Sequence, residues 1–378
     1  MDVRVARLRG FLSVDSSNSD LACELADLLL EQGATGEAEA ALDSLSPPAD
    51  STPGVRVRLA RIALASGRYE TAGSLLHALI DAGHGHEAVM HDLAFAQLCQ
   101  RDCEAADATI HDAIARHGAS PSLRILAARI ALMQERRADA LALLDETLAD
   151  EPGDVQALGV RALALFDDSR HPQAAEAALE CLRRDGDQHE ALLVAGTLAL
   201  WGQQVDVAET YFARALQRHP NSGRVLSGMG QCAMLRDDLA SARTTLEAAV
   251  KAMPDHIGTW HALAWTQLLQ GEQDTAESSY QRAYALDRNF GDTHGGLALI
   301  ALLRGDAEEA ERGIQRALRL DPNAITARYA KCLLLESRGD EAGAQALLQS
   351  LIAEGGGSGL PVREFGDRLK RRLSTRSH

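Results

Sequence analysis

The side chains most suited to binding a metal ion gather between positions 84 and 103. His86 and His91 are five residues apart, whereas the zinc-protease motif places two histidines four residues apart on one helical face. In a helix, a five-residue spacing turns the two side chains about 140° away from each other. Cys99 follows His91 by eight residues, which is roughly 12 Å along a helix and too far for one ion. We therefore predict no metal site and interpret the cysteines as packing residues.

A second stretch with chemical potential begins at Gly228 and includes Gly230. Glycines at this spacing cradle a dinucleotide when they follow a strand and open a helix. No strand pattern precedes Gly228, so close packing between helices is the better interpretation. The sequence also lacks a P-loop, a nucleophile elbow and a paired-carboxylate motif. We predict no catalytic residue, no cofactor and no enzyme activity.

The composition limits the classes of partner. The chain has 378 residues, 46% of them apolar, and a formal net charge of −16 at pH 7. This acidic balance argues against binding of nucleic acid, which needs clustered Lys and Arg. No run of apolar residues is long enough to cross a membrane, so we expect no membrane insertion. The six scattered cysteines favour a cytoplasmic protein, and the use of Arg in place of Lys favours a bacterial one.

A repeat of 34 residues explains the length, which exceeds the roughly 250–300 residues of one compact core. One column of the repeat holds alanine at all ten steps: Ala38, Ala72, Ala106, Ala140, Ala174, Ala208, Ala242, Ala276, Ala310 and Ala344. A second column, which starts at Ala26, holds a small residue at every step. Columns that start at Leu30 and Leu42 hold large apolar residues at nine of ten steps. Small residues in register indicate places where two helix axes approach closely.

Apolar residues within each unit recur at three and four spacings, which predicts two amphipathic helices per unit. Turn signals fall at a fixed phase between these helices. Glycines mark the turn inside a unit: Gly33, Gly67, Gly271, Gly305 and Gly339. Prolines mark the end of the second helix: Pro152, Pro220, Pro254 and Pro322. Each unit is therefore a predicted helix–turn–helix.

This pattern resembles the tetratricopeptide repeat, a 34-residue helix–turn–helix with set aromatic, small and proline positions. The copy at Ile257–Phe290 carries the pattern residues Trp260, Leu263, Ala264, Gly271, Ala276, Tyr280 and Ala283. The resemblance implies an all-α fold, a right-handed superhelical α-solenoid of antiparallel helix pairs. First helices would line its concave face and second helices its convex face.

Three segments follow from the repeat. Residues 1–18 are expected to form an N-terminal capping helix, with a lone second-type helix at Val3–Leu12. Ten tandem repeats tile residues 19–358. Residues 359–378 are expected to form a C-terminal solvating helix and a basic tail. Residues 46–54 read as a connection between helices because they contain Pro47 and Pro48.

The resemblance also places the partner-binding residues, because ligands of this family usually lie along the concave face. The matching positions form an unusually apolar inner face, typical of an interaction site: Phe95, Leu98, Met133, Leu163, Phe166, Leu193, Trp201, Met234, His261, Trp265, Leu269, Leu299 and Leu303. Packing between adjacent first helices is the alternative interpretation for each side chain. The Lys and Arg that clamp the tails of Hsp70 and Hsp90 in some family members are missing from matching positions such as His91, Leu193 and His261.

The sequence thus predicts a cytoplasmic, non-enzymatic scaffold or adaptor that binds an apolar protein or peptide segment in its groove. The acidic surface would favour a basic partner. Two other functions remain open. One is a dedicated chaperone or assembly factor for a bacterial secretion, pilus or envelope machine. The other is a regulatory or substrate-adaptor subunit of a separately encoded enzyme.

Overall fold

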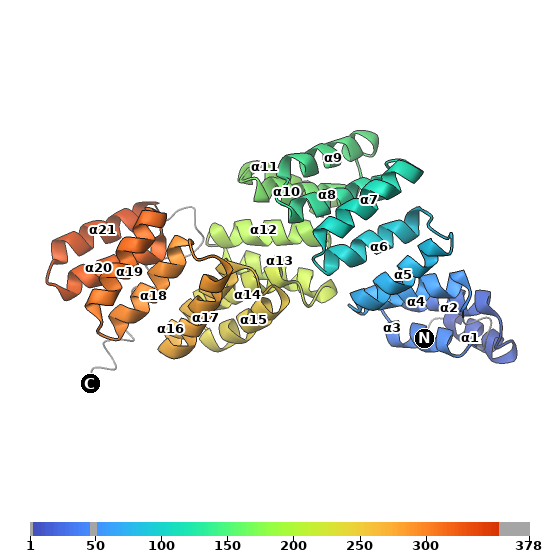
Figure 1. The fold of residues 1–378 in the computed structure, drawn as a ribbon, viewed down its shortest axis with the longest axis horizontal. Coiled ribbons are helices and arrows are strands. Elements are labelled where there is room, and N and C mark those ends of the chain that lie inside the picture. The colour runs from blue at the N-terminus through green and yellow to red at the C-terminus, as the bar shows by residue number, and fades with distance from the viewer. Residues whose placement is uncertain (1–2, 46–50, 355–378) are drawn as a thin grey trace. The chain divides into compact units, whose positions relative to one another are not determined.

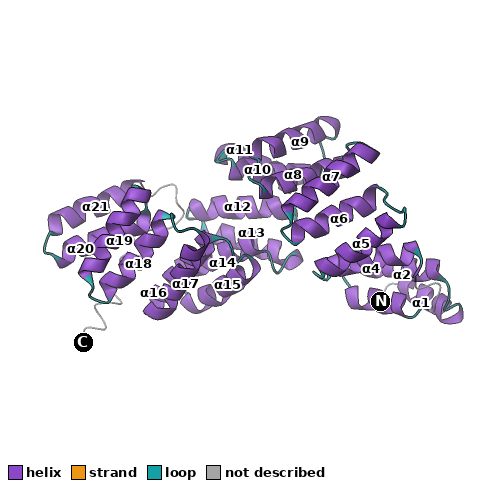
Figure 2. Cartoon of the chain, viewed as in Figure 1, coloured by secondary structure: helices purple, strands orange, loops and turns teal. Residues whose placement is uncertain are grey.

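The computed structural model describes residues 3–45 and 51–354, and these residues form helices without a strand (Figures 1 and 2). The helices in the described part of the chain are α1 Val3–Val14, α2 Ser19–Glu31, α3 Thr35–Asp43, α4 Pro53–Ala65, α5 Tyr69–Asp81, α6 Glu87–Cys99, α7 Cys103–His117, α8 Pro121–Met133, α9 Arg137–Asp150, α10 Val155–Asp167, α11 His171–Arg184, α12 His189–Trp201, α13 Val205–Arg218, α14 Gly223–Leu235, α15 Leu239–Ala252, α16 Ile257–Gln270, α17 Gln273–Leu286, α18 Gly291–Leu303, α19 Ala307–Leu320, α20 Ile325–Ser337 and α21 Glu341–Glu354.

The helices alternate as the repeat predicts. Even-numbered helices from α2 to α20 are the first helices, and the odd-numbered helices that follow them are the second helices. In the repeats that start with α2, α4, α6, α8, α12, α14, α16, α18 and α20, the two helices pack together, and each second helix also packs on the first helix of the next repeat. The predicted fold class is therefore confirmed: the chain is an all-α solenoid of antiparallel helix pairs.

The turn inside every 34-residue repeat places one residue in the left-handed backbone region. At this position φ is positive at every step of 34 residues, in glycines and non-glycines alike: Gly33, Gly67, Arg101, Glu135, Ser169, Gln203, Asp237, Gly271, Gly305 and Gly339. Glycine adopts such a backbone at no steric cost, which explains the five glycines found from the sequence. The other five turns have the same geometry with a side chain present.

The ends of the helices are fixed by side chains in register. The residue before several first helices accepts a hydrogen bond from the backbone N–H three residues later, as Asn18, Ser120 and Asp154 do. At the other end, proline follows the last residue of α9, α13, α15 and α19 by two positions. The proline column therefore ends second helices, as predicted. The loop expected at residues 46–54 is shorter than predicted, because α4 already begins at Pro53; residues 46–50 lie outside the described part.

The small columns of the repeat form the core. All ten alanines of the Ala38 column are buried. Where the second small column holds glycine, a Cβ atom would collide with a neighbour: at Gly196 it would lie 2.6 Å from Phe212, and at Gly230 it would lie 2.6 Å from Leu246. Gly228 is equally tight, at 2.4 Å from Phe212. These glycines therefore serve close packing between helices, and the dinucleotide interpretation is not needed.

The chain divides into two compact units, Met1–Ser169 and Arg170–His378. The first unit contains α1 to α10 and has core clusters around residues such as Leu25, Leu76 and Ile110. The second unit contains α11 to α21, and its largest cluster surrounds Trp265 and Tyr280. The predicted C-terminal helix at 359–378 lies outside the described residues. Among the described helices, none has the length and apolar character needed to cross a membrane.

Candidate interaction surfaces

Six of the predicted groove residues lie in the core instead of on a surface. Trp265 is 8% exposed and packs against Tyr329, with ring centroids 6.0 Å apart. Four others are also buried: Leu193, Met234, Leu269 and Leu299. Leu98 is 9% exposed and belongs to a core cluster of the first unit. The groove assignment does not hold for these side chains, because neighbouring helices cover the faces of the first helices on which they lie.

The remaining predicted residues keep solvent access. In the first unit, Met133 is 47% exposed, and Phe95, Leu163 and Phe166 are half-buried. In the second unit, Trp201, His261 and Leu303 are half-buried. Each unit therefore retains part of the predicted face.

The accessible residues of the first unit lie in register on consecutive first helices. Phe95 on α6 and Leu163 on α10 occupy the same repeat position, 68 residues apart, and Arg129 on α8 occupies that position between them. Met133 lies one helical turn beyond Arg129 on α8. The Arg129 guanidinium donates to Gln156 Oε1 at 3.1 Å. This face, defined by Phe95, Met133 and Leu163, is called the α6–α8–α10 face below.

His261 in the second unit is held by its surroundings. Its ring lies 5.3 Å from that of Tyr280 and 5.4 Å from that of Phe290, and its Nε2 atom is 2.8 Å from Thr293 Oγ1. Burial, helped by the charge of His256, lowers the pKa of His261 to about 4. His261 is therefore neutral near pH 7 and packs as a polar aromatic side chain.

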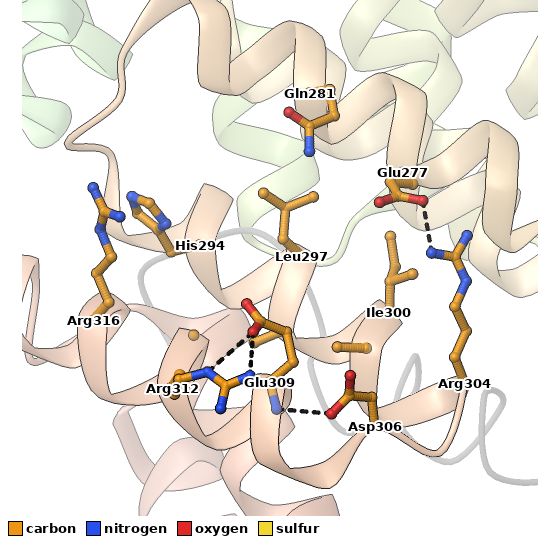
Figure 3. A pocket seen from close by; sticks show the side chains of 13 residues that line it. Glu277, Gln281, His294, Leu297, Ile300, Arg304, Asp306, Glu309, Arg312 and Arg316 are labelled. Atoms are coloured by element: carbon orange, nitrogen blue, oxygen red, sulfur yellow. Dashed lines mark hydrogen bonds and ion pairs between the residues drawn. The ribbon is translucent and has the colours of Figure 1, made fainter.

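A cleft of about 520 Å³ lies between α17, α18 and α19 (Figure 3). Leu297 and Ile300 of α18 provide apolar lining, while two ion pairs lie at its edges. Arg304 contacts Glu277 at 2.7 Å, and Arg312 contacts Glu309 at 2.7 Å. The lining holds three arginines and three acidic residues, so the cleft has no dominant charge. Sequence reasoning missed it because two of its three walls, α17 and α19, are second helices, which the groove hypothesis left out.

His86 and His91 make separate structural contacts. His86 caps α6 by accepting a hydrogen bond from the Val89 N–H, and His91 contacts Asp92. No group of three or more His, Cys, Asp or Glu residues that could hold a metal occurs in the described part of the chain. Burial raises the pKa of the Cys232 thiol to about 12, so this thiol stays protonated and unreactive.

Comparisons with known proteins agree with the helix-pair solenoid. Sequence profiles described as tetratricopeptide repeat match residues 125–189, 202–265 and 261–325. The general transcriptional corepressor ssn6 of Schizosaccharomyces pombe is 26% identical over 132 residues, which are 34% of this chain and 12% of the corepressor. The chain thus spans a small part of that relative.

Two solved structures share the fold. The structure described as the APC/C hetero-tetramer Cut9-Hcn1 matches with a TM-score of 0.70 and 16% identity, over 84% of this chain and 64% of that chain. The human IFIT1 dimer with m7Gppp-AAAA matches with a TM-score of 0.54 and 16% identity, over 100% of this chain and 96% of that chain. Taken with the repeat columns and the helix pairs, these matches show that the chain belongs to the tetratricopeptide repeat family.

Proposed function

We propose that this protein is a non-enzymatic scaffold or adaptor that binds an apolar segment of a protein partner on the α6–α8–α10 face. The observation that carries the proposal is the exposure of Met133, at 47%, beside two other accessible apolar side chains in register. Large apolar side chains that remain accessible in a row are typical of interaction sites. Methionine suits such a site because its flexible thioether adapts to different partners.

The energetics of this face fit a reversible interaction. Full burial of one large apolar side chain contributes about 1.5–3 kcal/mol. Three such contacts must offset the loss of translational freedom and the ordering of the partner segment. Together the three contacts contribute about 4.5–9 kcal/mol before those costs, so we expect binding weaker than micromolar, which corresponds to about −8 kcal/mol. The net charge of −16 favours a partner with basic residues beside its apolar ones.

The proposed location is the cytoplasm. All six cysteines are free thiols in the structure, four of them buried and two half-buried. Free thiols persist in a reducing compartment, where disulfides are rare.

The test compares affinity capture from the native cell with two matched variants. Met133→Glu places a charge on the α6–α8–α10 face, whereas Leu179→Glu places the same charge on an equally exposed side chain of α11. Both side chains point to solvent, so both variants should keep the helical content and melting temperature of the parent. We expect partners captured with the parent to be lost with Met133→Glu and kept with Leu179→Glu. Equal retention by both variants would refute the assignment of this face.

A further inference from the structure

The N-terminal helix α1 is apolar on two opposite sides. Its inner side buries Val5, Leu8 and Leu12 in the core cluster that α2 and α3 share. Its outer side exposes Val3 at 82% and Phe11 at 53%. In a surface helix of a monomer the outer side is normally polar, and a helix that is apolar on both sides is normally covered on both. Figure 1 shows α1 beside α2 at the N-terminal edge of the first unit.

The exposed side chains form one continuous stripe. Val14 is 89% exposed and completes a series with Val3, Arg7 and Phe11. At 3.6 residues per turn, these positions fall within about 100° of one another and face away from the buried side. We call Val3, Arg7, Phe11 and Val14 the outer stripe of α1. Its length, roughly 18 Å for the whole helix, suits contact with another helix.

The charges of α1 specify the chemistry of the contact. Arg4 contacts Glu24 at 2.6 Å, and Arg9 pairs with Glu37. Arg7, in the middle of the outer stripe, has no ion-pair partner among the described residues. The helix contains no acidic residue. The outer stripe therefore presents apolar groups around one unneutralised guanidinium.

We propose that the outer stripe of α1 binds an amphipathic helix of a protein partner that carries a carboxylate opposite Arg7. A second copy of this chain fits less well, because α1 holds no acidic residue that could face Arg7 of the other copy. An anionic membrane also fits less well, because Arg4 and Arg9 are already paired with Glu24 and Glu37, so α1 offers little free positive charge to a lipid surface. This surface is separate from the α6–α8–α10 face and does not depend on it.

The experiment measures binding of two synthetic helical peptides to the full-length protein by fluorescence anisotropy. Both peptides carry leucines at positions 1, 5, 8 and 12 of a 14-residue sequence, to match the stripe. One has glutamates beside the leucines and the other has lysines at the same places. We expect the acidic peptide to bind more tightly than the basic one, with a preference that weakens as salt increases.

Variants on α1 and a distant control then locate the binding. Phe11→Ser should weaken binding of the acidic peptide about tenfold or more. Arg7→Glu should weaken the acidic peptide about two- to fivefold and strengthen the basic one. Val207→Ser removes a side chain of α13 that is 44% exposed and should change neither affinity. Because Phe11 and Arg7 are exposed, their variants should melt like the parent; if Phe11→Ser does not, Val14→Ser replaces it.

Three results would overturn the proposal. One is equal binding of both peptides, or binding that Phe11→Ser leaves unchanged. Another is a dimer of the parent chain in sedimentation that Phe11→Ser abolishes, which would assign the stripe to a second copy. The last is binding to vesicles of anionic phospholipid that is lost with Phe11→Ser while neither peptide binds, which would assign the stripe to a membrane surface.

Discussion

At the scale of single residues, His261 couples stability to pH. The folded protein holds its pKa at about 4 through burial and the neighbouring charge of His256, whereas an unfolded histidine titrates near 6.5. Below about pH 6.5 His261 becomes protonated in the unfolded chain, but in the folded chain it stays neutral down to about pH 4. The stability from this group is therefore complete above about pH 6.5 and is lost as the pH falls towards 4. The free energy of unfolding lost between these two pH values is at most about 3 kcal/mol.

His261→Gln isolates this effect because glutamine is neutral and can still reach Thr293. Urea unfolding of the parent and the variant, measured at about pH 7.5, 5.5 and 4.5, gives the free energy of unfolding of each. The pKa of His256 is lowered too, by burial and by Arg224, but this contribution is present in both proteins. We expect the free energy of the parent to fall more steeply with decreasing pH than that of the variant. Parallel curves for the two proteins would show that His261 keeps its ordinary pKa.

At this scale, the burial of a side chain is the property that the sequence predicts least well. Trp201 ends the first helix α12 and Trp265 lies within the first helix α16, and both were predicted to line a groove. Trp201 is half-buried, with its ring 5.1 Å from that of His171, whereas Trp265 is covered by core neighbours including Tyr329. Periodicity assigns each residue to a helix face. How far the adjacent helix covers that face depends on side chains 30 or more residues away.

At the scale of elements, the left-handed turn between helices strains the backbone of residues other than glycine. Gly67 has a φ of 72°, and a Cβ atom added there would touch nothing within 4 Å. Gly36 in α3 also has open space around a Cβ atom, but its backbone is not left-handed. Alanine at Gly67 should therefore destabilise the first unit by about 1–2 kcal/mol through the backbone alone. Alanine at Gly36 should be neutral or stabilise by up to about 1 kcal/mol.

The two variants form a matched pair, because they make the same chemical change in the same unit and differ in backbone angle. Their urea midpoints, compared with that of the parent, measure the difference directly. An equal shift of the urea midpoint in both variants would mean that the substitutions act through the unfolded chain and not through the turn.

The sequence predicted these elements more fully than it predicted the surfaces. The columns of Ala38 and Ala26 defined the helix pairs because a small residue is needed wherever two helices approach closely. The turns at Arg101 and Glu135 adopt the same left-handed backbone as Gly33, yet their residue types give no sign of it. Their conformation is imposed by the two helices that each turn connects. The outer stripe of α1 was likewise missed, because the sequence shows two apolar faces without showing which one is covered.

At the scale of the whole molecule, stability is expected to be local, because the main contacts of the described helices run between neighbours along the chain. The structure divides into two units with separate core clusters. A defect in one unit should therefore loosen the helices around it without reaching distant repeats. This expectation separates a solenoid from a protein with one central core.

Gly296→Ala tests this locality in the second unit. A Cβ atom at Gly296 in α18 would lie 2.2 Å from the ring of Tyr280, which is fully buried. The overpacking should cost about 1–3 kcal/mol, and amide hydrogen exchange in α17 to α20 should become about 5- to 100-fold faster. Exchange in α2 to α5 of the first unit should stay unchanged, and Gly36→Ala should accelerate neither region. Faster exchange throughout both units would instead mean that the ten repeats unfold as one cooperative body, since a local clash would then lower the stability of every helix equally.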